Sequence, residues 1–435
     1  MQESGEPRVI PRQEHGISRA QIDKFALKVL YRLHESGFRA CLVGGGVRDL
    51  LLGREPKDFD IATDALPEQV RSLFGNCRLI GRRFRLAHVH FGRTIIEVAT
   101  FRAPHDHAEE DHQAEVQENG RILRDNVYGT LEQDVWRRDF SVNALYYDIR
   151  DFSVIDYVGG YADLQHGVLR LIGDPNTRYR EDPVRMLRAV RFAAKLGFRL
   201  DADSENALHD LNGLLRDASS ARLFDEVLKL LHGGVAHETF EVLRHYHLFE
   251  HLFPATEAAL NASDGEMLGW FIAGALESTD ARVQEGKPVN PAFMIAVMLW
   301  GDVLRRRDTR IEQGMGEFEA LLEASRDSIT AQNRHVAFPR RFSAQAQEIW
   351  TLQTRLRKTK GAGPLRLLEN GRFRAAYDFL CLRGKAGEGE EIEALCEWWT
   401  EFQAVNPDQQ RALAFTRGSG TGARRRRPRK RKPDA

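Results

Sequence analysis

The 435-residue sequence contains few cysteines and no cysteine pair of the CxxC type. Its four cysteines, Cys41, Cys77, Cys381 and Cys396, are scattered along the chain. This usage indicates neither a disulfide framework nor a zinc site, and it favours a protein of the reducing cytoplasm. A chain of this length can bury a large core and suggests two to four compact units.

The sequence also lacks a long hydrophobic run. The longest, Ala292 to Trp300, is far too short to span a bilayer. The first residues include Glu3, Glu6 and Glu14 and contain no apolar stretch of the signal-peptide kind. We therefore expect no stable membrane insertion.

The chain carries no formal net charge, but its basic and acidic residues are unevenly distributed. The chain has 63 basic and 63 acidic residues, yet residues 417–435 hold nine Lys or Arg against one Asp. This segment contains a Gly-Ser-Gly-Thr-Gly linker followed by the basic run, and it offers nothing to build a core, so we expect a disordered basic tail. Such a tail binds polyphosphates non-specifically and in a salt-dependent way, so RNA, DNA and anionic lipid are all candidate partners. Nucleic acid is favoured because the rest of the chain is net acidic and would otherwise repel RNA. A merely solubilising tail is the alternative.

One short stretch combines several features of a nucleotide site. Residues 38–43 have the composition of a strand, and three glycines follow, which let the backbone turn tightly and approach a ligand. Residues 47–52 then show helical spacing, with Arg48 in the first turn. Free N–H groups at a helix start and a guanidinium both suit phosphate. We predict that Gly44, Gly45 and Arg48 contact the phosphates of a nucleotide.

Two aspartates follow this turn. Lys57 to Thr63 alternates polar and apolar residues as a half-buried strand does, which places Asp58 and Asp60 on one face. Carboxylates this close raise each other's pKa unless a cation lies between them, and hard oxygen ligands suit Mg2+. Two such ions, roughly 3.5 to 4 Å apart, can activate an attacking hydroxyl and stabilise a departing pyrophosphate. A solvated strand edge is the alternative, and the upstream glycines and arginine disfavour it.

Later segments supply further candidates for the same site. Residues 94–102 have strand composition with one embedded acid, Glu97, whose face the alternation does not decide. We predict that Arg138 binds phosphate, that Asp139 binds a ribose hydroxyl or joins the catalytic acids, and that Asn143 orients the sugar. The alternatives are that Glu97 is an ordinary surface residue and that Asp139 simply caps a helix.

Residues 103–129 are polar and uneven, and they predict a mobile loop that closes over substrate. The histidines and acids of residues 105–112 form a conceivable metal site. It is disfavoured because no helical spacing brings these ligands together.

A helix is predicted over residues 181–197, with Pro183 at its first position and Gly197 at its end. Asp182 is then a natural helix cap, and Arg185 lies one turn onward. A carboxylate acceptor beside a guanidinium donor matches the edge of adenine and equally that of cytosine, whereas guanine and uracil present the opposite order. We predict that Asp182 and Arg185 read A or C. Beyond residue 201 the hydrophobic spacing is helical.

The combination of these motifs resembles class II members of the nucleotidyltransferase superfamily, which includes bacterial CCA-adding enzymes and poly(A) polymerases. The matching segments are Gly-Gly-Gly-Val-Arg-Asp to Asp-Phe-Asp, Glu-Val-Ala-Thr-Phe-Arg, Arg-Arg-Asp-Phe-Ser-Val-Asn-Ala-Leu and Glu-Asp-Pro-Val-Arg, within roughly residues 25–235. The resemblance implies an α+β fold with a small mixed-sheet palm (1–160), a helical neck (161–235), a helical RNA-binding body (236–416) and the basic tail (417–435).

The same resemblance implies a role for each candidate residue. Asp58 and Asp60 would bind metal, with either Glu97 or Asp139 as the further acid. The phosphates would be held by Arg48 and Arg138, and the incoming base would be read by Asp182 and Arg185.

Segments outside the shared motifs favour the poly(A) polymerase branch, because residues 79–92, 338–342 and 372–380 are similar to segments of those enzymes. This resemblance implies template-independent transfer of AMP from ATP to RNA 3′ ends, with a role in RNA polyadenylation and decay and with RNA-decay factors as partners. One alternative is a CCA-adding tRNA nucleotidyltransferase, which shares the catalytic residues but uses CTP and stops after three additions. A catalytically silent RNA-binding protein is the other.

Overall fold

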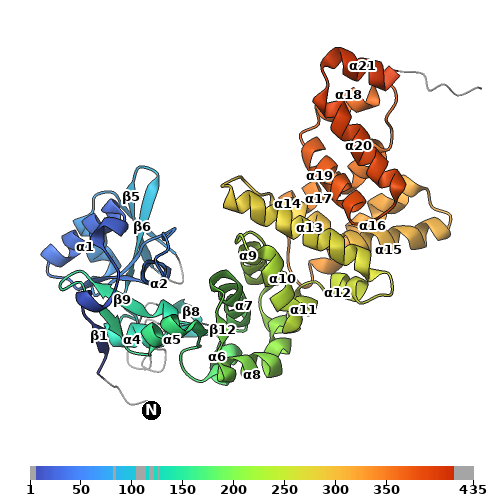
Figure 1. The fold of residues 1–435 in the computed structure, drawn as a ribbon. Coiled ribbons are helices and arrows are strands. Elements are labelled where there is room, and N and C mark those ends of the chain that lie inside the picture. Colours follow the sequence, from blue (N-terminus) through green and yellow to red (C-terminus); the bar gives the residue numbers. More distant parts are fainter. Residues whose placement is uncertain (1–5, 82–84, 104–113, 117–121, 126, 416–435) are drawn as a thin grey trace, which may run out of the picture. The chain divides into compact units, whose positions relative to one another are not determined.

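The computed structural model describes residues 6–81, 85–103, 114–116, 122–125 and 127–415. The chain divides into two compact units, the first ending at His251 and the second beginning at Leu252 (Figure 1). The first unit combines a mixed sheet with helices, and the described part of the second contains helices only. The predicted α+β class is confirmed. The basic tail lies outside the described residues.

The sheet of the first unit has eight strands, with one parallel pair among antiparallel neighbours. In sheet order the strands are β1 (Arg8–Ile10), β10 (Val154–Asp156), β9 (Leu145–Asp148), β2 (Ala40–Val43), β3 (Asp60–Thr63), β6 (Thr94–Thr100), β5 (Leu86–Phe91) and β4 (Cys77–Ile80). The parallel pair is β3 and β6, in which Ile61 lies opposite Val98. The two strands that carry predicted site acids are therefore neighbours.

Helices cover both faces of the central strand β2, whose four residues are all buried. Cys41 and Val43 pack on one face against Leu131 and Val135 of α4 (Leu131–Trp136). The opposite face lies against α1 (Lys24–Glu35), a helix capped by the Asp23 carboxylate. The other helices that contact this sheet or its loops are α2 (Gly45–Leu51), α3 (Pro67–Leu73) and α5 (Gly160–His166). This sandwich holds the end of β2 and the glycine turn rigidly.

The rest of the first unit is mainly helical, as the spacing predicted. Its elements are β11 (Val168–Leu169), α6 (Pro175–Glu181), α7 (Val184–Leu196), β12 (Arg199–Leu200), α8 (Ala202–Leu211), α9 (Ser220–Leu231), α10 (Ala236–His245) and α11 (Phe249–Leu252), the last of which reaches the unit boundary. The helix predicted to end at Gly197 does so, because this glycine adopts a φ of +70° that closes α7.

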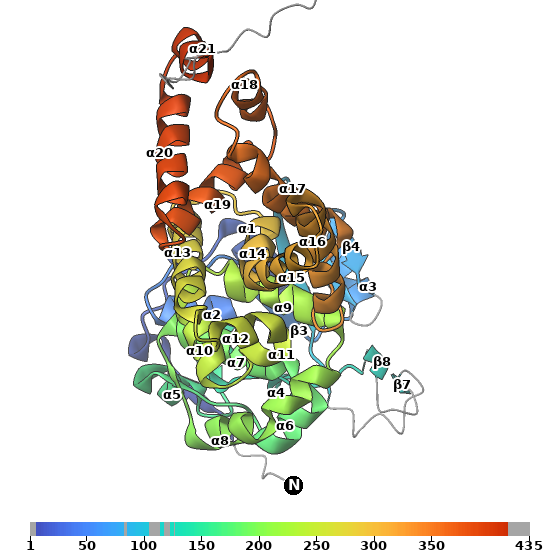
Figure 2. The same ribbon diagram turned by 90° about the vertical axis from the view of Figure 1, so that its right-hand side faces the viewer.

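The predicted loop over residues 103–129 is only partly correct. Strands β7 (Ala114–Val116) and β8 (Ile122–Asp125) pair antiparallel as a separate two-stranded sheet (Figure 2). The sequence did not reveal these strands, because segments of three and four residues are too short to show a hydrophobic period. The histidine-rich residues 105–112 lie outside the described residues.

The second unit is a set of helices around aromatic cores. Its helices are α12 (Pro254–Leu260), α13 (Gly265–Gln284), α14 (Pro291–Met298), α15 (Trp300–Glu312), α16 (Glu317–Gln332), α17 (Arg340–Leu356), α18 (Gly363–Leu368), α19 (Phe373–Lys385), α20 (Glu390–Ala404) and α21 (Pro407–Phe415). One core centres on Trp399 and Phe402, and the Trp399 indole donates to the carbonyl of Leu356. Among the described helices, none is both long and apolar enough to cross a membrane.

A disulfide joins Cys381 of α19 to Cys396 of α20, with 5.1 Å between the two Cα atoms. The expectation that the cysteines form no cross-link is therefore wrong for this pair. Spacing alone could not reveal it, because the two residues are 15 positions apart and meet only when α19 packs against α20. The argument from cysteine usage for a reducing compartment loses its support accordingly.

Candidate active site

The glycine turn between β2 and α2 lies directly against the predicted catalytic acids. Gly44 has a φ of +73°, a conformation that side chains disfavour. A Cβ placed there would lie 3.8 Å from both the Asp60 carboxylate and the Arg138 guanidinium. A Cβ on Gly46 would lie 3.2 Å from the backbone oxygen of Asp58. Gly44 is thus required by its backbone conformation, and at Gly46 a side chain would crowd the backbone of Asp58.

Three carboxylates gather at the end of β3. The register between β3 and β6 sets Asp60 beside Glu97, one position before the pair of Ile61 with Val98. Asp60 keeps contact with solvent, but burial raises its pKa to about 6, and the charges of Glu97 and Asp58 add to the rise. Asp58 lies in the extended segment before β3, which begins at Asp60 rather than at Lys57 as predicted. The two aspartates nevertheless remain close enough to repel each other.

Glu97 and Asp139 have different surroundings. The negative charge of Glu97 raises the pKa of Asp60. The Glu97 carboxylate is also 3.2 Å from Nε2 of His88 on the adjacent strand. Asp139 instead pairs with Arg188 of α7 and accepts hydrogen bonds from its neighbouring amide and from Asn143. Burial raises the pKa of Asp139, but Arg188 and these hydrogen bonds outweigh it and leave that pKa below its usual value. The acid grouped with Asp60 is thus Glu97.

The alternative of a helix cap does not describe Asp139. The short 3-10 helix that follows, Ser141–Asn143, has Phe140 at its N-cap and no side-chain capping bond. Asp139 accepts from the backbone amide of Phe140, from the Asn143 side chain and from Arg188, and Arg188 is its only charged hydrogen-bond partner among the described residues.

Arg138 lies beside the acids and is held in place by the buried Tyr146 and the half-buried Asp134. Its Nε donates to the Tyr146 hydroxyl at 2.6 Å, and its Nη2 donates to Asp134 at 3.0 Å. The Tyr146 hydroxyl also donates to Asp134, at 2.6 Å. Burial lowers the pKa of Arg138, but Tyr146 and Asp134 outweigh this and keep it above its usual value, so the group stays cationic. Its Nη1 faces Gly44.

Arg48 lies behind the turn and is 3 % exposed. Its guanidinium donates to Asp49 at 2.7 Å and to the side-chain oxygen of Asn143 at 2.7 Å, and it lies over the ring of Phe192. The nearest approach to the turn is at Gly45, where a Cβ would lie 3.4 Å from Arg48. The structure therefore joins two predicted nucleotide ligands, Arg48 and Asn143, to each other.

Asp182 and Arg185 flank the start of α7 but have separate partners. The predicted cap at Asp182 is wrong, because α7 has Pro183 at its N-cap and Asp182 is the C-cap of α6. The Asp182 carboxylate accepts from the amide of Val184 and from Arg222 at 2.7 Å. Arg185 donates to the Arg178 carbonyl at 2.7 Å and to Glu181 at 2.9 Å. Both side chains of the predicted base-reading pair therefore have protein groups as partners.

Three residues of this site were missed by the sequence reasoning. Asp134 precedes Arg138 by one helical turn, and that spacing is a signal that could have found it. The pairing of Arg188 with Asp139 spans 49 positions, and that of Arg222 with Asp182 spans 40. No local pattern encodes such distances.

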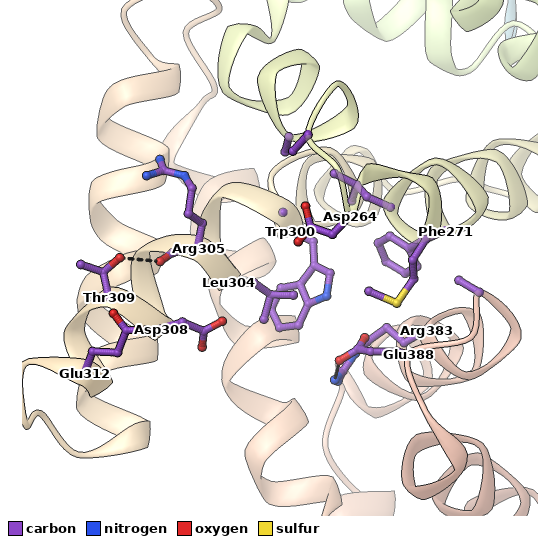
Figure 3. A pocket seen from close by; sticks show the side chains of 16 residues that line it. Asp264, Phe271, Trp300, Leu304, Arg305, Asp308, Thr309, Glu312, Arg383 and Glu388 are labelled. Carbon is purple, nitrogen blue, oxygen red and sulfur yellow. Dashed lines mark hydrogen bonds and ion pairs between the residues drawn. The ribbon is translucent and has the colours of Figure 1, made fainter.

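A separate cavity of about 510 Å3 lies within the second unit, and none of the predicted site residues lines it (Figure 3). Its wall includes Phe271 and Trp300, with the Arg383 guanidinium 5.1 Å from the Trp300 ring centre. Arg383 is paired with Glu388. The cavity is thus distinct from the acid cluster, and the chemistry inferred below does not involve it.

Three segments of the chain match known families. Residues 40–170 match the family described as Poly A polymerase head domain, residues 197–260 the probable RNA and SrmB-binding site of polymerase A, and residues 313–433 the polymerase A arginine-rich C-terminus. Poly(A) polymerase I of Salmonella typhimurium is 48% identical over 429 residues, which cover 98% of this chain and 92% of that protein. The chain belongs to the poly(A) polymerase family.

More distant relatives share only part of this similarity. The CCA-adding enzyme of Bacillus pumilus is 38% identical over 227 residues, 52% of this chain and 54% of that enzyme. The crystal structure of the Bacillus stearothermophilus CCA-adding enzyme in complex with CTP superposes with a TM-score of 0.56 at 26% identity, covering 88% of this chain and 85% of that one. The predicted family and the nucleotidyltransferase class of the enzyme are therefore confirmed.

Proposed function

We propose that this enzyme transfers AMP from ATP to the 3′ hydroxyl of RNA without a template. The observation that carries the proposal is the carboxylate cluster of Asp58, Asp60 and Glu97 beside the glycine turn, in a chain similar over nearly its whole length to poly(A) polymerase I. Relatives that add CCA match about half of the chain. The poly(A) reading is therefore favoured over the CCA-adding one.

The acid cluster fits a divalent cation. Three carboxylates meet where burial and mutual repulsion raise the pKa of Asp60 to about 6, so a cation would relieve an unfavourable concentration of negative charge. The three carboxylates of the cluster offer hard oxygen ligands, which suit Mg2+. We propose Asp58 and Asp60 as the magnesium ligands, with Glu97 as the further acid and Asp139 in a supporting position. When bound, Mg2+ would supply charge that favours an ionised hydroxyl and a departing pyrophosphate.

The protein's own groups would position ATP around this cluster. Arg138, cationic and directed at Gly44, is placed to hold a phosphate beside Asp60. The turn at Gly44 and Gly45 lets the nucleotide approach the backbone closely. Arg48 supports the turn from behind and fixes the Asn143 amide, and we assign Asn143 to the sugar.

Base selection is assigned to Asp182 and Arg185. Each is held by a partner on the protein surface, Arg222 with 49 % of its side chain exposed and Glu181 with 47 %. Exposed ion pairs of this kind contribute only about 0–1 kcal/mol, so a base edge can replace them at small cost. An adenine edge offers the matching donor and acceptor.

The remaining assignments extend this proposal. We divide the chain into a palm (1–160), a neck (161–235), an RNA-binding body (236–416) and a basic tail (417–435). The region matching the RNA and SrmB-binding description, residues 197–260, supports contact with RNA. We further propose a role in RNA polyadenylation and decay, with RNA-decay factors as partners. We place this activity in the cytoplasm, where RNA ends and ATP are available.

An incorporation assay tests the proposal. Purified protein, a generic RNA without a tRNA acceptor stem, Mg2+ and each nucleoside triphosphate in turn should yield long products with ATP alone. A product that stops after three additions and requires CTP would identify the CCA-adding activity instead. Absence of pyrophosphate release with every nucleotide would indicate the silent RNA-binding protein.

The variant Asp58→Ala separates catalysis from folding. It should abolish transfer while circular dichroism and thermal unfolding remain close to those of the parent, because Asp58 is exposed and lies outside the sheet. A folded, fully active variant would show that the acid assignment is wrong.

A further inference from the structure

A second group of metal-binding side chains lies outside the site described above. Glu205 and His209 are one helical turn apart on α8, and His245 is the last residue of α10. The three potential ligand atoms, one from each residue, all lie within 4.8 Å of one another. Positions i and i+4 share a helix face, so α8 offers two ligands side by side and α10 brings the third.

The donor set differs in kind from that of the acid cluster. Two imidazole nitrogens and one carboxylate oxygen form a common three-ligand set for zinc, which leaves a fourth position for water. Tetrahedral zinc with bonds of 2.0–2.1 Å needs ligand atoms about 3.4 Å apart. Both histidines are exposed and Glu205 is half-buried, so modest side-chain rotations can close the remaining distance.

The surroundings of Glu205 resemble the outer support of a metal ligand. The Tyr246 hydroxyl donates to Glu205 at 2.7 Å, and a carboxylate retains lone pairs for a cation alongside such a bond. The ring of His209 packs edge-on against those of Tyr246 and His245, with centroids 5.1 and 6.1 Å away. These contacts restrict how the ligands can turn.

We propose that Glu205, His209 and His245 form a binding site for a divalent transition-metal ion, with zinc as the preferred occupant. Bound metal would cross-link α8 to the end of α10. Because α8 packs on α6 and α10 packs on α7, the cross-link would brace the pair of helices whose junction carries Asp182. Mg2+ would not compete, since it prefers oxygen ligands in octahedral geometry.

Zinc titration of the full-length, untagged protein tests the proposal. Isothermal calorimetry with ZnCl2 is run in excess Mg2+, which occupies oxygen-only sites, and compares the parent with His209→Ala and His245→Ala. His34→Ala is the matched control, because His34 is an exposed helical histidine on α1, away from the cluster. The quantity of interest is the difference between parent and variant, so zinc bound at other places in the chain cancels.

We expect one zinc ion per chain to be lost, or bound at least about tenfold more weakly, in each histidine variant and to be retained in the control. Zinc should raise the unfolding temperature of the parent and of His34→Ala but not that of the two variants. Tyr246→Phe, which keeps all three ligands, should weaken zinc by about tenfold. Equal zinc binding by parent and both cluster variants, or no zinc binding by the parent, would overturn the proposal. Should an alanine variant misfold, His209→Gln and His245→Gln provide the same comparison.

Discussion

Replacing Asp60 by asparagine should stabilise the metal-free protein while destroying its activity. Asparagine has the same shape as aspartate but carries no charge, so it removes the group whose pKa is raised from 3.8 to about 6 by burial first and by the charges of Glu97 and Asp58 second. A rise of roughly two pKa units corresponds to an upper limit of about 3 kcal/mol. Because Asp60 is in contact with solvent, which screens its charge, we expect a gain of about 1 kcal/mol.

The pH dependence of this gain follows from the direction of the shift. Between pH 3.8 and about 6 the folded state binds more protons at Asp60 than the unfolded state does, so the parent loses stability as pH rises through that window. The advantage of Asp60→Asn is therefore complete above pH 6, about half as large at pH 5 and nearly absent below pH 4.

Thermal unfolding in EDTA at pH 7.5 and pH 5 measures the effect. For a unit of about 250 residues, 1 kcal/mol corresponds to roughly 2–4 °C in Tm. Asp225→Asn, an exposed mid-helix aspartate of α9, is the matched control and should leave Tm unchanged at both pH values. Saturating Mg2+ should raise the Tm of the parent but not that of Asp60→Asn. An Asp60→Asn protein that is no more stable than the parent at pH 7.5, or whose gain is as large at pH 5, would refute the charge-repulsion argument.

Three further substitutions test the support around the site. Gly44→Ala should lower the free energy of unfolding by about 1–3 kcal/mol, because alanine is strained at this positive φ. It should also reduce the rate of AMP incorporation at least tenfold. A variant with parental activity would show that the turn tolerates a side chain. Arg188→Ala should lower the free energy of unfolding in urea by about 2 kcal/mol. The reason is that the Asp139 carboxylate, which is 12% exposed, loses the cation that it pairs with. Unchanged stability would contradict that pairing. Asp134→Asn should reduce kcat/KM for ATP about 10- to 100-fold through misplacement of Arg138, with Tm nearly preserved, and an unaltered kcat/KM would remove Asp134 from the site.

Local signals predicted much of the fold but not its long-range pairings. The strand before the glycines, the helix ending at Gly197 and the amphipathic face of α9, with Leu223, Val227 and Leu230 buried, all follow from spacing and turn chemistry. The short strands β7 and β8 and the disulfide between α19 and α20 do not. Each of these depends on segments that meet only after the chain has packed.

The candidate site shows the same division. Asp58 and Asp60 could be found because alternation places both on one side of an extended segment. The choice between Glu97 and Asp139 could not be made in that way, since it depends on the parallel register of β3 with β6 and on the charge of Arg188. Which acid joins the cluster is therefore a property of tertiary structure.

The partners of the arginines indicate how the site can accept a nucleotide without a large rearrangement. Arg138 has two of its nitrogens fixed by Asp134 and Tyr146, which leaves the third directed at the turn, so its cation is already oriented. Arg185 and Asp182 are instead held by half-exposed partners whose ion pairs are weak. The phosphate would thus be bound by Arg138, which is held in a fixed orientation. The base would be read by Asp182 and Arg185, whose present ion pairs can be exchanged for the base edge. That arrangement suits an enzyme that must hold the triphosphate firmly while it tests which base has entered.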